Sequence, residues 1–350
     1  MGYEEFLRAI PKVDLRVTFG GVFRKDTLML IAEQNDIPST MKKFKDWADL
    51  LDAPDYARLD EIMQTVSGWL VHPDDLTRLV YDMGVILARD NVKYVEVLVN
   101  PSIYMAQGMT FEQFLTAMND GRDRAERGWG IQIRWILTIH REEPRKSDEI
   151  VRWATSATGG KGGVVAMVLV GDETVQPPGQ FVRAFNTAHK KNLPSGAYVG
   201  MQRGAEGITE TLQELSPDRY LDVIGLAESV DAIDAIAESG KMVNISPTRD
   251  IKHGWVESLD KHPVRQIFDA GIPVSISAEM PTFYDATLSD NYALLVNEVG
   301  LSLDEVEEIA LNGIRYSFML EDEKTAMLEV FQEKFDRLRD EHIVSSEETT

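Results

Sequence analysis

The sequence predicts an α/β protein built as a (β/α)8 TIM barrel, and two observations carry this prediction. Short runs rich in β-branched residues recur along the chain, and segments whose apolar residues have helical spacing separate them. A length of 350 residues also suits one such barrel with a few added helices. We therefore expect parallel strands joined by crossover helices, in a single domain over residues 1–340 followed by a polar tail over 341–350.

Each predicted strand is a short apolar run bounded by polar or glycine-containing segments. In chain order the eight runs are VDLRVTF (13–19), YVEVLVN (94–100), IQIRWILTIH (131–140), VVAMVLVG (164–171), GAYVGMQ (196–202), DVIGLA (222–227), MVNIS (242–246) and IPVSISAE (272–279). Segments such as FEQFLTAMNDGRDRAERG, between the second and third runs, have the spacing of the crossover helices.

Extra helices are expected in two places. Residues 26–90, between the first and second runs, are helical in composition and are interrupted by Pro38, Pro54 and Pro73. Beyond residue 300, apolar residues again follow helical spacing, and Ser302 with Glu305 has the spacing of a capping box. We interpret both segments as additions to the barrel, between strands 1 and 2 and at the C-terminus.

Composition excludes several classes of function. The net charge of −22 opposes binding to phosphate backbones, so we do not expect a nucleic-acid-binding protein. No apolar run reaches the roughly 18 residues that a membrane span needs. The absence of cysteine excludes thiolate chemistry, and the N-terminus has no signal-peptide pattern. We expect a cytoplasmic protein whose partner is a small-molecule ligand or substrate, and we leave a homo-oligomer open.

The active site of such a barrel lies at the C-terminal ends of its strands, so the residues that close each run are the candidates. In chain order they are Arg16 and Thr18, Glu96 and Asn100, His140 and Arg141, Asp172 and Glu173, Tyr198 and Met201, Leu226 and Glu228, Thr248 to Asp250, and Glu279 and Met280.

Several of these segments together resemble the adenosine deaminase family over nearly the whole chain. The matching pieces occur in family order and include PKVDLRV, KYVEVLVNP, LVGDET, YVGMQRGAE, ISPT and DAGIPVSISAEMPTFYDATLSDNY. The resemblance implies a zinc ion held by two histidines on the first strand, one on the fifth and an aspartate on the eighth. It also implies a metal-bound water that attacks a purine carbon, with a glutamate and a further histidine handling protons.

The chain departs from that pattern at the positions that carry the chemistry. The metal-ligand positions hold Arg16, Thr18, Tyr198 and Glu279, the two proton-handling positions hold Met201 and Leu226, and the neighbour of the eighth-strand ligand is Met280. One carboxylate cannot hold catalytic zinc, which takes about three protein ligands. We therefore predict no metal and no other cofactor, with a site of Asp172, His140 and Glu279 as the alternative metal site.

The substituted residues suggest a replacement for the metal. The first and eighth strands are neighbours in a closed barrel, so Arg16 and Glu279 should face one another. A guanidinium forks well onto a carboxylate, and we hypothesise that Arg16 replaces the metal electrostatically. A purely structural network is the alternative. Tyr198 can donate a hydrogen bond, act as an acid or stack on a planar ring.

The remaining candidates divide into two groups. Catalytic candidates are Arg16, Tyr198, Glu279 and Asp172. Substrate-binding candidates are Thr18, His140, Glu173, Met201, Leu226, Arg249, Asp250 and Met280. The pair Arg249 and Asp250 fits a loop salt bridge as well as a substrate clamp. The methionines and Leu226 make the predicted pocket more apolar than that of a deaminase, which favours a flat or hydrophobic ligand.

Three functional hypotheses follow. The first is a metal-independent enzyme of hydrolase or lyase type that acts on a nucleoside-like, heterocyclic or amine-bearing small molecule. In it Arg16 holds an anionic group, Glu279 or Asp172 is the base, and Tyr198 is the acid. The second is a non-catalytic pseudoenzyme that binds a ligand or partner, because the metal, acid and base positions have all changed. The third is a zinc-dependent adenosine or purine deaminase, which rests on the resemblance alone.

Overall fold

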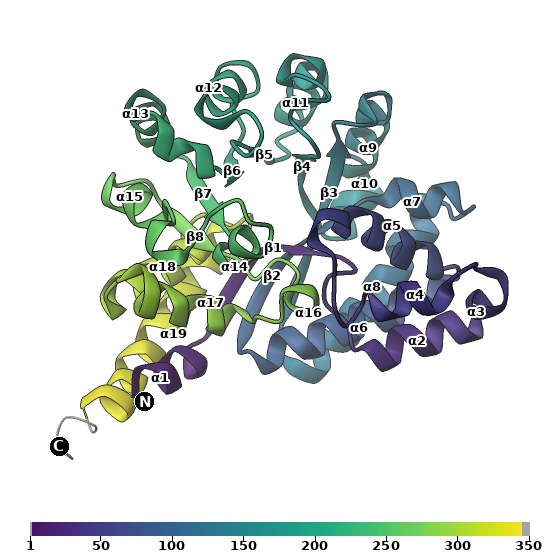
Figure 1. The fold of residues 1–350 in the computed structure, drawn as a ribbon, viewed down its shortest axis with the longest axis horizontal. Helices are drawn as coiled ribbons and strands as arrows, with labels where there is room; N and C mark the ends of the chain where they lie inside the picture. The colour runs from purple at the N-terminus through teal and green to yellow at the C-terminus, as the bar shows by residue number, and fades with distance from the viewer. Residues whose placement is uncertain (1, 345–350) are drawn as a thin grey trace.

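A computed structural model describes residues 2–344 and confirms the predicted barrel. Eight parallel strands form one sheet in the order β1 to β8, and helices surround them (Figure 1). The strands are β1 (Lys12–Thr18), β2 (Val92–Val99), β3 (Gln132–His140), β4 (Val164–Val170), β5 (Ser195–Val199), β6 (Arg219–Asp222), β7 (Met242–Ile245) and β8 (Val274–Ile276). Of the predicted tail, residues 345–350 lie outside the described part of the chain.

The helices include both expected additions. The α-helices are α1 (Gly2–Ala9), α2 (Lys25–Gln34), α3 (Ile37–Thr40), α4 (Phe44–Asp49), α5 (Leu59–Trp69), α6 (Pro73–Arg89), α7 (Pro101–Ala106), α8 (Phe111–Trp129), α9 (Ser147–Ala154), α10 (Ala157–Lys161), α11 (Val182–Lys190), α12 (Gly204–Glu214), α13 (Val230–Ser239), α14 (Pro247–Lys252), α15 (Val264–Asp269), α16 (Pro281–Tyr284), α17 (Leu288–Leu294), α18 (Leu303–Arg315) and α19 (Glu321–Arg339). Helices α2 to α6 form the insertion between β1 and β2. Helices α18 and α19 form the C-terminal addition, and the predicted capping box of Ser302 and Glu305 begins α18.

One predicted strand was wrong in its position. The run over 222–227 was expected to be the sixth strand, but β6 ends at Asp222 and residues Ile224–Glu228 form a short 3₁₀ helix, η4. The cause is local, because Asp222 and Val223 both have positive φ values, 77° and 39°, and this turns the chain out of the sheet. The apolar run has the composition of a strand because Val223 and Leu226 are both fully buried.

The barrel closes between its first and last strands through a buried carboxylate. Asp14 on β1 accepts hydrogen bonds from the Ser277 hydroxyl at 2.6 Å and the Ala278 backbone N–H at 3.0 Å, just beyond β8. The Thr18 backbone N–H donates to the carbonyl of Glu279 at 3.0 Å. This seam therefore places the C-terminal ends of β1 and β8 side by side.

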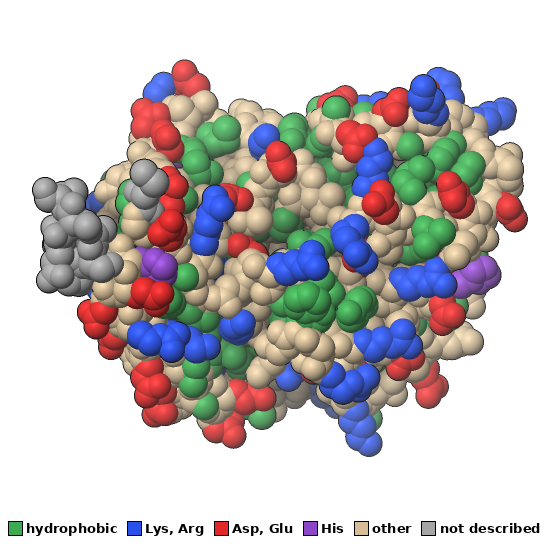
Figure 2. All heavy atoms as spheres, turned by 90° about the horizontal axis from the view of Figure 1, so that it is seen from below, with side chains coloured by type: hydrophobic (Ala, Val, Ile, Leu, Met, Phe, Trp, Pro, Cys, Tyr) green, Lys and Arg blue, Asp and Glu red, His purple; other side chains and the backbone are tan. Residues whose placement is uncertain are grey.

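The outer surface mixes both signs of charge. Figure 2 shows acidic and basic side chains interspersed over one face, with apolar side chains in small groups between them. Over residues 2–344, no helix combines the length and the apolar character needed to cross a membrane. The described surface thus carries charges of both signs, while other charged side chains, among them Arg16, Asp222 and Glu279, are buried.

Candidate functional site

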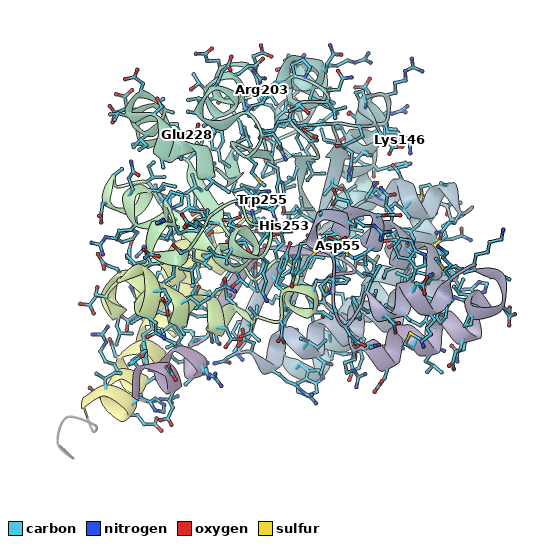
Figure 3. The ribbon with its side chains drawn as sticks, viewed as in Figure 1. Asp55, Lys146, Arg203, Glu228, His253 and Trp255 are labelled. Atoms are coloured by element: carbon cyan, nitrogen blue, oxygen red, sulfur yellow. The ribbon has the colours of Figure 1, made fainter. Side chains whose placement is uncertain are left out.

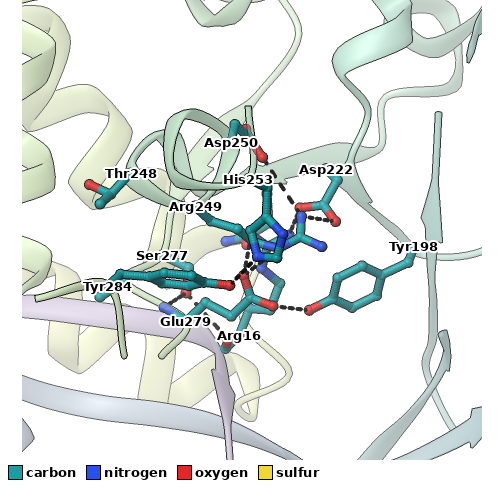
Figure 4. A network of polar contacts seen from close by, with 12 residues as sticks. Arg16, Tyr198, Asp222, Thr248, Arg249, Asp250, His253, Ser277, Glu279 and Tyr284 are labelled. Carbon is teal, nitrogen blue, oxygen red and sulfur yellow. Dashed lines mark hydrogen bonds and ion pairs between the residues drawn. The ribbon is translucent and has the colours of Figure 1, made fainter. Parts of the chain in front are cut away.

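Arg16 lies at the centre of a buried polar network at the C-terminal ends of the strands (Figure 4). Its side chain has no exposed surface. One guanidinium nitrogen, Nη1, contacts Oδ1 of Asp222 at the end of β6, and Nη2 lies 3.4 Å from Oε2 of Glu279 just beyond β8. The predicted contact between Arg16 and Glu279 is therefore present, and Asp222 joins it.

Arg249, in the first turn of α14 after β7, completes a closed arrangement of charges. Its Nη1 lies 2.5 Å from Oδ2 of Asp222, and its Nε lies 3.0 Å from Oε2 of Glu279. Each carboxylate thus contacts both guanidinium groups. We call Arg16, Asp222, Arg249 and Glu279 the ion-pair ring. Its formal charges sum to zero, and this balance offsets the cost of removing four charges from water.

Backbone geometry at two positions of the ion-pair ring is unusual. Asp222 and Glu279 are not glycines, yet their φ values are 77° and 57°. Such conformations cost about 1–3 kcal/mol each and persist where the surrounding structure holds them. At Glu279 the backbone is held on both sides, because its N–H donates to the Ser277 hydroxyl at 2.9 Å and its carbonyl accepts from Thr18. Strain of this kind clusters at functional sites.

Tyr198, at the C-terminal end of β5, connects the ion-pair ring to the barrel mouth. Its hydroxyl donates a hydrogen bond to Oε1 of Glu279 at 3.0 Å, and the residue is partly exposed. Burial of the hydroxyl and the nearby Glu279 charge raise the pKa of Tyr198 well above its ordinary value, so the phenol stays protonated. Burial also raises the pKa of Glu279, although Arg249 and Arg16 oppose this shift.

A second buried pair supports α14 from outside the ring. Oδ2 of Asp250 accepts a hydrogen bond from Nε2 of His262 at 3.0 Å, while Nδ1 of His262 accepts one from the Val264 backbone N–H at 3.1 Å. Because Nδ1 is an acceptor, we assign the ring proton to Nε2. The Oδ1 atom of Asp250 lies 3.7 Å from Nη1 of Arg249, farther away than the carboxylates of the ring.

Aromatic side chains line the mouth above Arg249. The Arg249 guanidinium carbon lies 4.3 Å from the ring centroid of Trp255 and 5.6 Å from that of Tyr198. His253 stacks on Trp255 with centroids 4.2 Å apart, and both lie near the middle of the molecule in Figure 3. Tyr56, from the insertion before α5, packs 5.7 Å from His253. Trp255 is 40% exposed, so part of this aromatic group faces solvent.

The structure brings only some of the sequence candidates together. Arg16, Tyr198, Glu279 and Arg249 meet directly, and Sδ of Met201 lies 3.4 Å from Nη1 of Arg249. Thr18 is partly exposed at the end of β1, Leu226 is fully buried in η4, and the Met280 side chain fits against Gly21, where a Cβ atom would come within 2.3 Å of it.

Three candidates from β3 and the loop after β4 have other partners. Glu173 is buried and accepts backbone hydrogen bonds from residues 200–202, at 2.9, 2.8 and 3.0 Å. Asp172 is exposed and caps its own turn by accepting from the Thr174 backbone N–H at 2.8 Å. His140 pairs with the Thr138 hydroxyl at 3.0 Å. None of these contacts joins the three side chains to the ion-pair ring.

Sequence reasoning missed Asp222 and His262. Asp222 was hidden by the misplaced sixth strand, which put the strand end four or more residues too late. His262 is far from any strand end in sequence and reaches Asp250 only through the fold. A signal for Asp222 existed, because it is an acidic residue that directly follows the apolar pair Tyr220 and Leu221.

The residues present do not fit the zinc ion that the family resemblance implies. A cationic guanidinium and a protonated phenol stand at Arg16 and Tyr198, where the resemblance places histidine ligands. Within the described part of the chain, no group of three or more histidine, aspartate or glutamate side chains could hold a metal ion. The same holds for the alternative site of Asp172, His140 and Glu279.

Comparison with known proteins gives one family and several relatives. The sequence profile described as adenosine deaminase matches residues 11–334. Aminodeoxyfutalosine deaminase of Streptomyces avermitilis is 27% identical over 315 residues, covering 90% of this chain and 88% of the relative. Adenosine deaminase of Shewanella woodyi is 25% identical over 334 residues, covering 92% and 98%. The crystal structure of adenine deaminase from Arthrobacter aurescens superposes with a TM-score of 0.84 at 20% identity, covering 93% and 99%.

Proposed function

The chain belongs to the adenosine deaminase family, and from this premise we propose that it is a metal-independent member that acts on a nucleoside-like, heterocyclic or amine-bearing small molecule. The relatives named above are deaminases, which supports an enzyme of hydrolase type. The observation that carries the proposal is the ion-pair ring. Two guanidinium groups supply two fixed positive charges beside a tyrosine that reaches the barrel mouth.

In this proposal Glu279 and Tyr198 handle the proton. A carboxylate whose pKa is raised is a better proton acceptor near neutral pH, and burial raises the pKa of Glu279. Tyr198 keeps its proton and directs it at Oε1, so it fixes the orientation of the carboxylate. Asp172 is exposed and apart from the ring, so the proposal gives the base role to Glu279 alone.

Arg16 has a different role from the one its sequence position suggests. A side chain with no exposed surface cannot touch a ligand, so Arg16 is a positioning residue that holds Asp222 and Glu279. Arg249 is the least buried member of the ion-pair ring, at 10% side-chain exposure. It is therefore the charged group that a bound molecule would meet.

A pseudoenzyme that binds a small molecule is the second candidate. It is favoured by the saturation of the carboxylates, because Asp222 and Glu279 each contact both guanidinium groups. Carboxylates paired in this way also fit a structural role. The two candidates differ in one measurable property, which is turnover of a bound molecule.

The test combines metal analysis with a substrate panel. The metal content of the purified protein is measured by mass spectrometry before and after dialysis against a chelator. Turnover of purine nucleosides, nucleobases and amine-bearing heterocycles is followed by liquid chromatography on both samples. We expect much less than one zinc ion per chain and turnover that neither chelator nor added zinc changes. Glu279→Gln should lower the rate by about 10²- to 10⁴-fold, the range for one general base.

A matched variant at an exposed site controls for nonspecific effects. Glu257→Gln alters an exposed glutamate on the surface and should leave the rate unchanged. Zinc near one ion per chain that is required for turnover would contradict the proposal. Binding of panel members with no product formed would instead favour the pseudoenzyme.

A further inference from the structure

One guanidinium nitrogen of the ion-pair ring remains available to a ligand. Within residues 2–344, the hydrogen bond and ion pairs found for Arg249 use Nε and Nη1, which contact Glu279, Asp222, Asp250 and Met201. Nη2, which carries two N–H groups, is therefore the nitrogen of Arg249 for which no hydrogen bond or ion pair was found among these residues. The side chains of Arg16 and Asp222 have no exposed surface and that of Glu279 has 4%, whereas Arg249 has 10%.

Besides the carboxylates, the surroundings of Arg249 include two aromatic rings. Its guanidinium carbon lies over the rings of Trp255 and Tyr198, and Trp255 is 40% exposed. Aromatic side chains bind the planar faces or edges of other rings and add to the energy of apolar burial. The carboxylates that contact Nε and Nη1 fix the orientation of the guanidinium, so little freedom is lost when a ligand binds.

We propose that Arg249 and Trp255 recognise a neutral planar ring that carries a carbonyl oxygen, and that Nη2 of Arg249 donates to this oxygen. This inference rests on the proposed function and narrows its substrate class from heterocycles in general to oxo-heterocycles. Arg249 then takes the part of an electrophilic group that polarises the carbonyl. Trp255 is a specificity-determining residue that contacts the ring.

The charges around Nη2 decide between ligand classes. A guanidinium can only donate, so a protonated amine or an exocyclic amino group directed at Nη2 finds no acceptor there. A carboxylate would gain from Arg249 but would lie close to Glu279 and Asp222, and the chain as a whole carries a charge of −22. A neutral carbonyl oxygen avoids both penalties and still receives a charge-assisted hydrogen bond.

The experiment measures binding of three matched ribosides by calorimetry on chelator-treated full-length protein. Inosine carries a carbonyl oxygen on its ring, adenosine carries an amino group there, and purine riboside carries only hydrogen. We expect inosine to bind about tenfold or more tightly than purine riboside, since a hydrogen bond to a charged group contributes about that factor. Adenosine should bind no better than purine riboside.

Two substitutions test whether Arg249 and Trp255 cause the preference for inosine. Arg249→Lys keeps the positive charge but removes Nη2, so the preference for inosine over purine riboside should disappear. Trp255→Ala should weaken all three ribosides, whereas Trp129→Ala removes a tryptophan of similar exposure, 38%, on α8 and should leave all three unchanged. If Arg249→Lys does not fold, the ranking of the three ribosides on the wild-type protein still decides.

The inference is overturned if adenosine or purine riboside binds as tightly as inosine, if the folded Arg249→Lys variant keeps the preference, or if none of the three binds. Failure of the proposed function would be seen in a different measurement. The metal analysis would then show a zinc ion that turnover requires, whatever the order of affinities of the three ribosides. A preference for inosine that responds to Arg249 and Trp255 supports the inference in either case.

Discussion

At the scale of single residues, two arginines pair with two buried carboxylates, and one of them, Arg16, stands at a position where the family resemblance implies a metal ligand. A guanidinium offers a planar fork of donors that matches a carboxylate, and Arg16 and Arg249 use this geometry on Asp222 and Glu279. The ring is neutral as a whole, but it becomes charged when any one member is removed. A single substitution therefore leaves an unbalanced buried charge, and its cost in stability can be measured.

Replacing Arg16 tests the balance of charge directly. Arg16→Met keeps most of the side-chain volume but leaves Asp222 and Glu279 with one cation between them. We expect a loss of about 3–5 kcal/mol in the free energy of unfolding, the cost of breaking a buried pair by removing one partner. Urea denaturation followed by circular dichroism measures it.

The control is an arginine on the surface. Arg58 pairs with Glu61 three residues away, and both side chains are about half exposed. Arg58→Met should leave the urea midpoint unchanged, because exposed pairs contribute little. If Arg16→Met proves as stable as the wild-type protein, the ring does not have the electrostatic role that we assign to it.

At the scale of elements, most of the barrel could be predicted, but not every strand end. Runs of β-branched residues marked seven strands well because parallel strands are buried on both faces and need continuous apolar sequence. The sixth failed because Val223 and Leu226 are buried in a turn and in η4, and burial alone gives the same apolar composition. Asp222 was missed for this reason.

The candidate site was predictable only where neighbouring strands decide it. Strand adjacency in a closed barrel was enough to place Arg16 opposite Glu279. The pairing of Arg249 with both carboxylates depends on the side-chain direction within α14, which a sequence pattern does not specify. The contact of His262 with Asp250 depends on the path of a loop.

The loop after β5 can be tested by comparing substitutions at two neighbouring residues, Glu173 and Asp172. The Glu173 carboxylate holds this loop by accepting three backbone N–H groups, from residues 200, 201 and 202. Glu173→Ala leaves these three donors without their acceptor, and the N–H of Gly200 among them is buried, so we expect a loss of about 2–4 kcal/mol in unfolding free energy. Hydrogen exchange at residues 200–202 should become faster.

The neighbouring residue is the matched control for that loop. Asp172 is exposed and caps only its own turn, so Asp172→Ala should change stability by less than about 1 kcal/mol. Its exchange rates at residues 200–202 should equal those of the wild-type protein. Equal effects of the two substitutions would contradict the assignment of Glu173 as the brace of this loop.

At the scale of the whole molecule, the site exists only because the barrel closes. Arg16 comes from β1 and Glu279 follows β8, at opposite ends of the chain in sequence. Hydrogen bonds between paired strands join each strand to the next in the order β1 to β8. The seam from β8 back to β1 depends instead on Asp14, with its contacts to Ser277 and Ala278, and on the bond between Thr18 and Glu279.

Asp14 should therefore control both closure and the geometry of the ion-pair ring. Asp14→Ala removes the acceptor of three hydrogen bonds, including one from the Arg16 backbone N–H at 3.2 Å, and should cost about 3 kcal/mol or more. Asp14→Asn should cost less, because burial raises the pKa of Asp14 and a neutral side chain avoids the buried charge.

The control is Asp218, which accepts a hydrogen bond from the Ser195 backbone N–H at 2.9 Å. Strands β5 and β6 keep their own pairing when Asp218 is replaced. Faster hydrogen exchange at β1 and β8 in Asp14→Ala, but not at β5 and β6 in Asp218→Ala, is the expected result. Equal exchange at β1 and β8 in the Asp14→Ala and wild-type proteins would mean that the seam is held by something other than this carboxylate.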